Sequence, residues 1–171
     1  MPTIGGIMEK FLYVMIGAPG SGKSTFISNH LKDGSVWVSR DAIRYSMVSE
    51  DEDYFSKESE VLAQFIKSVN EMLSPKQPYK YIFADATHLN EKSRKKLLNN
   101  LKYKPTEIIG LYFDIPLETI QKRNAQRTGR ERVPTQIVTK MYKSMTIPSK
   151  KEGFDRVFII NENDKVKGVI K

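Results

Sequence analysis

The chain has 171 residues and a formal net charge of +8, with 28 lysines and arginines against 20 aspartates and glutamates. This length suits one α/β domain, and we expect residues 1–171 to form a single domain. Cysteine is absent, which excludes disulfide bonds, a cysteine zinc site and a thiol nucleophile and fits a cytoplasmic protein. No apolar run reaches the roughly 20 residues that a membrane-spanning helix needs, so we expect no membrane partner. Residues 1–7 lack the features of a secretory signal and are expected to be an optional or disordered extension.

The first predicted strand is the unbroken apolar run Phe11–Ile16. It leads directly into a stretch that matches the pattern G-x-x-x-x-G-K-[ST] without a gap. The residues of that stretch are Gly17, Ala18, Pro19, Gly20, Ser21, Gly22, Lys23, Ser24 and Thr25. Apolar residues then recur at helical spacing and predict a helix that ends near Asp33 and Gly34.

A strand, a glycine loop and a helix in this order direct several backbone N–H groups and the helix dipole at one anion. Gly20 and Gly22 have no Cβ, so the chain can bend tightly and approach a phosphate oxygen closely. Lys23 is then placed to reach the β- and γ-phosphates, and the Ser24 hydroxyl to ligate Mg²⁺. The stretch Gly17–Thr25 therefore predicts a binding site for a nucleoside triphosphate.

A second strand is predicted at Val36–Val38, and Arg40, Asp41 and Arg44 follow it closely. If a helix begins here, Asp41 and Arg44 lie about one turn apart on the same face. Asp41 could then take a proton from an attacking hydroxyl while Arg44 grips an anion on the same molecule. The alternative is that Asp41 caps the helix and pairs with an arginine at the surface.

The third predicted strand, Tyr81–Ala84, ends at Asp85. An aspartate at the end of an apolar strand is typical of the Walker-B partner of Mg²⁺. Asp85 could instead orient Arg44 through a buried ion pair, and spacing alone does not separate these two interpretations. His88 has no other metal-ligating residues beside it in the sequence, so we expect it to be structural.

The fourth predicted strand is Ile108–Phe113, and the helix after it carries Arg123 and Arg127 one turn apart. This helix runs into the arginine-rich residues 128–132. Because the planar guanidinium group can spread over phosphate oxygens, such a segment indicates a lid over a triphosphate. A solvated basic helix is the alternative.

Helices are expected between the strands. A long apolar stripe from Phe55 to Leu73 predicts one that ends before Pro75. Three more helices are predicted. One is capped by Asn90 and buries Leu97, Leu98 and Leu101; another has Pro116 in its first turn, and the last follows Val133-Pro134.

With a fifth strand at Val157–Ile160, the order of elements predicts an α/β fold. We expect the three-layer P-loop kinase fold, with a five-stranded parallel sheet and helices on both faces. Ligands of such sheets collect at the carboxyl ends of the strands, which is where the candidate residues fall.

The residues after the strands resemble the phage-type polynucleotide 5′-hydroxyl kinases, within the wider group of P-loop kinases. The resemblance covers roughly residues 9–145. It rests on the motifs Gly17–Thr25, Ser39–Arg44, Asp85–Asn90, Phe113–Pro116 and Lys122–Arg127, together with Val133-Pro134 and Met141–Met145.

The resemblance implies that Lys23 and Ser24 hold ATP and Mg²⁺ and that Asp41 is the general base on a 5′-hydroxyl group. It implies further that Arg44 binds the 3′-side phosphate of the acceptor, that Asp85 supports Arg44, and that Arg127 acts on the donor phosphates. We also expect Arg123 beside ATP, and Arg40 and Thr87 beside the acceptor.

Two features depart from the family. No sequence remains for the 3′-phosphatase domain that the best-known phage enzyme carries. His88 after Thr87 also differs from the Thr-Asn pair often found there, which affects the detail of acceptor recognition.

We therefore expect transfer of the γ-phosphoryl group of ATP to the 5′-hydroxyl end of DNA or RNA, a reaction of nucleic acid end repair. The basic segments at residues 91–104 and 122–132 favour such a polyanionic partner, although net charge also serves solubility. One alternative is a kinase that acts on a nucleoside, a sugar or an antibiotic. Another is a nucleotide-dependent switch, although the Asn-Lys-x-Asp motif of guanine-specific switches is absent. The sequence leaves the oligomeric state open.

Overall fold

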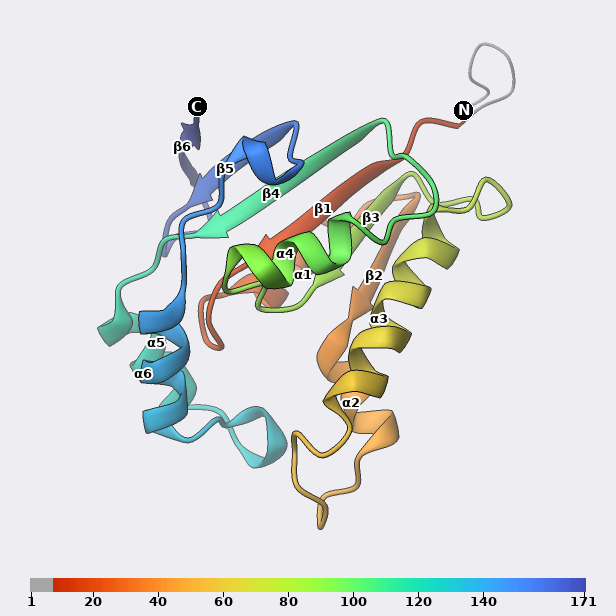
Figure 1. Cartoon of the computed structure of the whole chain (residues 1–171). Helices are drawn as coiled ribbons and strands as arrows, with labels where there is room; N and C mark the ends of the chain where they lie inside the picture. Colours follow the sequence, from red (N-terminus) through yellow and green to blue (C-terminus); the bar gives the residue numbers. More distant parts are fainter. Residues whose placement is uncertain (1–7) are drawn as a thin grey trace.

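The computed structural model describes residues 8–171 (Figure 1). The predicted extension, residues 1–7, lies outside the described residues. The strands are β1 (Phe11–Ile16), β2 (Ser35–Ser39), β3 (Tyr81–Asp85), β4 (Glu107–Phe113), β5 (Arg156–Ile160) and β6 (Val166–Ile170). The α-helices are α1 (Lys23–His30), α2 (Arg40–Met47), α3 (Glu58–Leu73), α4 (Glu91–Leu98), α5 (Leu117–Ala125) and α6 (Thr135–Ser144), and two short 3₁₀ turns are η2 (Gly129–Glu131) and η3 (Lys150–Glu152).

The strands form one sheet in the order β2-β3-β1-β4-β5-β6. The first five strands pair in parallel, at the five apolar runs that the sequence indicates. The predicted P-loop kinase fold is therefore confirmed. The sheet differs from the prediction in a sixth strand, because β6 folds back antiparallel to β5.

The sequence gives β6 little signal because the strand lies at the edge of the sheet and remains largely in water. Val166 and Val169 are exposed by 56% and 51%. A strand of this kind has no continuous apolar run, which is the feature that marks the buried strands of a parallel sheet.

Two apolar layers cover the two faces of the sheet. Leu12, Val14 and Ile16 of β1 face α3 and α4, because alternate residues of a strand point to the same side. Met15 points the other way and packs with α1, α5 and α6. Figure 1 shows α3 and α4 lying in front of the sheet, with α5 and α6 beyond the carboxyl ends of the strands.

Several helix boundaries differ from the predictions. Helix α3 begins at Glu58, so Phe55 lies before the helix and is 45% exposed instead of joining the apolar stripe. Helix α1 ends at His30, before the predicted Asp33-Gly34, because Leu31 is already extended. Leu101 likewise lies beyond the end of α4, and Pro116 occupies the cap position before α5 instead of its first turn.

The expected cap of α4 is confirmed. The Asn90 side chain accepts a hydrogen bond from the backbone N–H of Ser93, and the Ser93 hydroxyl bonds back to Asn90. Within the described part of the chain, no helix has the length and apolar character needed to cross a membrane.

Candidate active site

The loop between β1 and α1 adopts a conformation that depends on its glycines. Gly20 and Gly22 have φ angles of 87° and 97°, in the left-handed region that side chains rarely tolerate. A Cβ at Gly20 would lie 2.9 Å from the carbonyl oxygen of Ile120 in α5. The loop is also tied to the end of β3, because the Gly17 N–H donates to the Thr87 carbonyl at 2.9 Å. The Thr87 backbone thus supports the phosphate loop.

The first turn of α1 leaves its amide groups free. Within residues 8–171, the backbone N–H groups of Lys23, Ser24 and Thr25 have no protein acceptor, and no side chain caps the helix at Gly22. Unpaired N–H groups at a helix N-terminus, combined with the helix dipole, favour an anion. The residues present therefore fit a bound triphosphate.

Lys23 is held at the centre of this site. Its ammonium group donates to the carbonyl oxygens of Gly17 at 2.8 Å and Ala18 at 3.1 Å. Burial lowers the pKa of Lys23 to about 8; Asp85 and Asp41 oppose this shift and Arg127 adds to it. These charges come from α2, from the end of β3 and from the segment after α5, so those elements converge on the lysine.

Asp85 lies beside the loop rather than beside Arg44. Its Oδ2 accepts hydrogen bonds from the Trp37 indole at 2.9 Å and the Ser24 hydroxyl at 3.5 Å. Burial raises the pKa of the Asp85 carboxyl group, while the charge of Lys23 lowers it. The arrangement agrees with the Walker-B interpretation of Asp85.

The Ser24 hydroxyl and the Asp85 carboxylate supply the hard oxygen donors that Mg²⁺ prefers. The described residues contain no group of three or more His, Cys, Asp or Glu side chains that could hold a metal. A magnesium ion at this position would therefore keep water and phosphate oxygens as its other ligands, as it commonly does in P-loop proteins.

The second group of candidate residues lies on α2, and its geometry excludes the cap interpretation of Asp41. The cap of α2 is Ser39, whose hydroxyl accepts from the Ala42 N–H at 3.1 Å. Asp41 instead accepts from Arg44 Nη1 at 2.6 Å, on the shared helix face that the spacing predicts. The Asp41 side chain is 62% exposed, so its carboxylate remains open to a substrate.

Glu58 is a site residue that the sequence analysis missed. It lies at the start of α3, where its two carboxylate oxygens accept from Arg44 Nε at 2.7 Å and from Arg40 Nη2 at 2.8 Å. Asp85, by contrast, forms no hydrogen bond or ion pair with Arg44 in the described part of the chain, so the support that the resemblance implies is not formed in this structure. An acidic residue in a first helical turn is common, and only the packing of α3 on α2 reveals its role.

Tyr54 is the second missed residue. Its hydroxyl donates to Asp41 Oδ1 at 3.0 Å and accepts from Arg44 Nη1 at 3.1 Å. Arg44 is only 5% exposed as a result of these contacts. Among the described residues, Arg44 Nη2 and Asp41 Oδ2 have no hydrogen-bond partner, so one donor and one acceptor remain for a ligand.

The arginines after β4 occupy the opposite side of the site. Arg123 donates to the carbonyl oxygens of Ser21 at 3.2 Å and Glu162 at 2.8 Å, which places it against the phosphate loop. Arg127 lies farther along and donates only to the Glu131 carbonyl, at 3.4 Å, within the described residues. Arg127 is thus the less constrained of the two.

The segment 126–134 reaches across the site toward α2 (Figure 1). Arg130 donates to the Val48 carbonyl, and its guanidinium lies 4.5 Å from the centre of the Tyr45 ring. The base of the segment is fixed because the Asn124 side chain pairs with the backbone of Val133 through two hydrogen bonds. Anchored at one end and touching the far side at its tip, the segment has the form of a lid.

His88 is structural, as expected. It is 4% exposed, its Nδ1 donates to the Met15 carbonyl at 2.7 Å, and its own carbonyl accepts from Arg94. Burial lowers the pKa of His88 to about 4, so the ring is neutral at pH 7.

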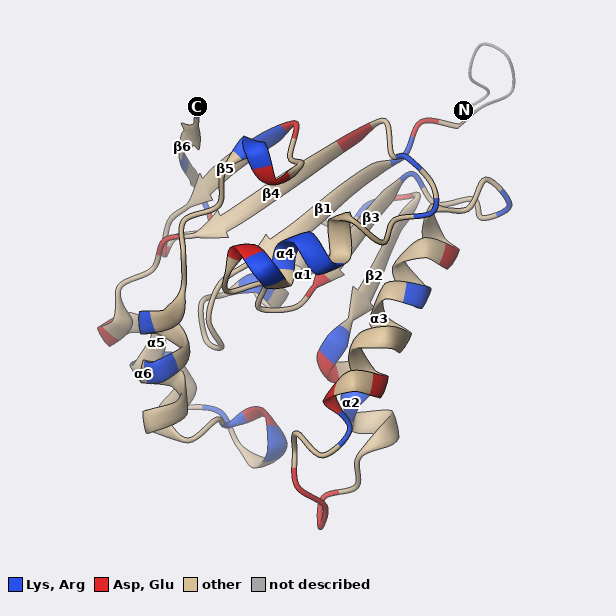
Figure 2. Ribbon diagram, viewed as in Figure 1, with Lys and Arg blue, Asp and Glu red and all other residues tan. Residues whose placement is uncertain are grey.

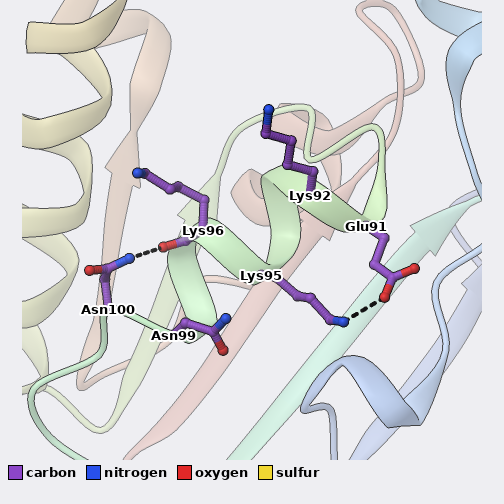
Figure 3. A pocket seen from close by; sticks show the side chains of 6 residues that line it. All are labelled: Glu91, Lys92, Lys95, Lys96, Asn99 and Asn100. Carbon is purple, nitrogen blue, oxygen red and sulfur yellow. Dashed lines mark hydrogen bonds and ion pairs between the residues drawn. The ribbon is translucent and has the colours of Figure 1, made fainter.

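Lysines gather on α4 (Figure 2), which packs on the opposite face of the sheet from α1. They line a shallow depression of about 600 Å³, whose residues are Glu91, Lys92, Lys95, Lys96, Asn99 and Asn100 (Figure 3). Lys95 pairs with Glu91 at 2.6 Å, whereas Lys92 and Lys96 have no acidic partner in the described part of the chain. The depression contains none of the candidate catalytic groups.

Residues 12–148 match the family model AAA_33, described as an AAA domain. The chain belongs to this AAA domain family. Its curated relatives include L-seryl-tRNA(Sec) kinase of Methanococcus maripaludis, 27% identical over 84% of this chain and 56% of that protein. Another is Transcription factor bHLH140 of Arabidopsis thaliana, 26% identical over 87% of this chain and 16% of that protein. The chain thus spans about half or less of these relatives.

Solved structures with a similar fold also include kinases. The Pnkp1/Rnl/Hen1 RNA repair complex contains a chain that is 26% identical, with a TM-score of 0.64 over 80% of this chain and 44% of that one. A sugar kinase from Janibacter sp. reaches a TM-score of 0.62 at 16% identity, over 92% of this chain and 87% of that one. The second likeness shows the fold alone.

Proposed function

We propose that this protein is an ATP-dependent polynucleotide kinase that phosphorylates the 5′-hydroxyl end of DNA or RNA. The observation that carries the proposal is the pair formed by Asp41 and Arg44. It joins an exposed carboxylate to an anion-binding guanidinium, on the helix that shares the carboxyl edge of the sheet with the phosphate loop.

Each partner of the pair has a role in phosphoryl transfer. The free oxygen of Asp41 orients the 5′-hydroxyl group and accepts its proton. The hydroxyl oxygen then bonds to the γ-phosphorus, the bond to the β,γ-bridging oxygen breaks, and ADP leaves. Lys23 and the free amides of α1 bind the donor phosphates, and Arg127 stabilises the charge that develops on the transferred group. Mg²⁺ held beside Ser24 would contribute further charge neutralisation.

Arg44 favours an acceptor that carries its own anion. A neutral sugar or nucleoside would leave the free Nη2 of Arg44 without a charged partner, whereas the 3′-side phosphate of a 5′-terminal nucleotide supplies one. Arg40 lies on the same helix and shares Glu58 with Arg44, so both arginines are fixed beside the acceptor. The similarity to a chain of an RNA repair complex and to a relative named L-seryl-tRNA(Sec) kinase supports an acceptor that contains RNA.

The proposal can be tested by transfer of radiolabelled γ-phosphate from ATP. The acceptors would be a 5′-hydroxyl oligonucleotide, a nucleoside 3′-monophosphate, the matching nucleoside, and gluconate as a sugar acid. We expect kcat/KM to be highest for the oligonucleotide and higher for the nucleoside 3′-monophosphate than for the nucleoside. Transfer to gluconate alone would assign the protein to the small-molecule kinases, and ATP binding without transfer to any acceptor would favour a nucleotide switch.

A further inference from the structure

Phe55 is an exposed aromatic residue beside the acceptor groups, and the chemistry described so far gives it no role. It is 45% exposed, although the spacing of apolar residues predicted it to be buried in α3. The Arg44 guanidinium lies 5.7 Å from the centre of the Phe55 ring and 4.6 Å from that of Tyr54. The two rings meet edge to face, with centroids 4.8 Å apart.

The segment that carries Phe55 is held in place by its own polar contacts. The Phe55 N–H donates to Asp53 Oδ1 at 2.8 Å, and Glu52 accepts from both the backbone and the hydroxyl of Ser49. Lys57 donates to the Met47 carbonyl at the end of α2 at 2.7 Å. The ring is therefore presented on a loop that is closed at both ends, which limits the entropy that ligand binding would cost.

We propose that Phe55 is the stacking surface for the base of the acceptor's 5′-terminal nucleotide. This inference rests on the proposed function, since it needs an acceptor with a base. Arg44 connects the two parts of the subsite, because it pairs with Asp41 at 2.6 Å and its guanidinium lies 5.7 Å from the centre of the Phe55 ring. A nucleotide with its 5′-hydroxyl at Asp41 and its phosphate at Arg44 has its base within reach of Phe55.

Stacking on an aromatic ring suits an enzyme that must accept many sequences. Every base has a π-face, so stacking contributes affinity without selecting one base, at about 1–3 kcal/mol per base. The groups that contact the ring are the Arg44 guanidinium and the Tyr54 ring, and both can pack against any of the four bases. We therefore expect the subsite to require a base but to discriminate weakly among the four.

The test compares two 5′-hydroxyl oligonucleotides that differ only in the 5′-terminal residue, which is a normal nucleotide in one and an abasic tetrahydrofuran in the other. For the wild type, kcat/KM should be about 5- to 150-fold higher for the normal acceptor, mostly through KM. Phe55→Ala should remove this preference and leave both the kcat/KM for the abasic acceptor and the KM for ATP unchanged. Phe55→Trp should restore the preference for the normal acceptor.

Tyr103→Ala is the matched control, because Tyr103 is also exposed, by 40%, but lies beyond α4 and outside the acceptor groups. It should keep the wild-type preference. The inference is overturned if the wild type uses both acceptors equally, or if Phe55→Ala slows both to the same extent. Failure of the wild type to phosphorylate either oligonucleotide would instead remove the proposed function itself.

Discussion

At the scale of single residues, the paired side chains of Asp41 and Arg44 differ in their exposure to solvent. The Asp41 carboxylate is open to the solvent, whereas Arg44 is enclosed by Asp41, Tyr54 and Glu58. Burial strengthens the charge interactions of a guanidinium group, and three oxygen partners offset the cost of removing it from water. The arginine is thus rigid before any acceptor binds, and rigidity is what positioning for an in-line transfer requires.

Asp41→Asn should lower kcat on the order of 10²–10⁴-fold, because the amide keeps the shape of the side chain but cannot accept the hydroxyl proton. The KM for ATP should change little. Ser39, not Asp41, caps α2, so we also expect the melting temperature to stay near that of the wild type. Steady-state kinetics and a thermal melt check both points, and a large drop in melting temperature with normal kcat would contradict the assignment.

Arg44→Ala tests which anion the guanidinium group binds. A charge-assisted contact to phosphate should contribute about 1.5–3 kcal/mol, which corresponds to about 10- to 150-fold in kcat/KM. We expect this loss with a nucleoside 3′-monophosphate and a much smaller loss with the nucleoside, which has no phosphate to bind.

Arg156→Ala is the control for Arg44→Ala, because Arg156 pairs with Glu107 on β4 and lies outside the site. Melting temperatures should accompany the kinetics, since Arg44 is buried and its removal leaves Glu58 with only Arg40. Equal losses for the nucleoside and its 3′-monophosphate would mean that Arg44 only holds the structure of α2.

At the scale of elements, the site is assembled from the two sides of the sheet's carboxyl edge. Helices α2 and α3 carry the groups that we propose bind the acceptor, whereas α5 and the segment 126–134 carry the arginines that we propose act on the donor. Arg130 joins the two sides through Val48 and Tyr45. If the segment 126–134 acts as the proposed lid, its opening would break this contact with α2.

The connection between β3 and α4 contains His88, which has a positive φ of 45° and a buried, neutral ring. Its pKa is about 4 in the folded chain and about 6.5 when unfolded, so the unfolded chain binds the proton more tightly. The free energy of unfolding should therefore fall as the pH falls from about 6.5 to about 4, by about 3 kcal/mol from this residue.

His88→Asn should flatten that part of the stability profile, because asparagine tolerates a positive φ and does not titrate. The measurement is urea denaturation at several pH values between 4 and 7. An unchanged slope in the variant would show that another group causes the acid sensitivity.

The sequence predicts the site best where the chemistry is local. The phosphate loop, the Asp41–Arg44 pair on one helix face and the Asn90 cap follow from spacing alone, since each involves residues within a few positions. Tyr54 and Glu58 could not be predicted, because their partners on α2 are brought to them only by the packing of α3.

The errors in the fold have a similar cause. Phe55 fits the apolar period of α3, but the stripe does not reveal that the helix begins only three residues later, at Glu58. Strand β6 lies at an edge and has no fully buried residue, so its sequence pattern is weak.

At the scale of the whole molecule, the charge of +8 is unevenly distributed (Figure 2). Helix α4 begins six residues after Asp85, at the carboxyl edge, and packs on the same face of the sheet as α3 (Figure 1). The helix is rigidly attached, because Arg94 forms a buried ion pair with Glu152 at 2.8 Å. We expect the strand that follows the 5′-terminal nucleotide to pass over this helix.

Neutralising Lys92 and Lys96 together to glutamine tests that path. A long acceptor should lose affinity while a dinucleotide should not, because only the long strand reaches α4. Each lost phosphate contact on a single strand lowers the slope of log K against log salt by about 0.7, so the slope should fall by about 1.4 for the double variant. Lys32→Gln is the control, since Lys32 is exposed next to Tyr81, on the face that α1 covers.

KM values for acceptors of 2, 6 and 20 nucleotides, measured at several salt concentrations, test this path over α4. Equal losses for the dinucleotide and the 20-mer, or an unchanged salt slope, would show that the α4 lysines serve solubility and not the acceptor.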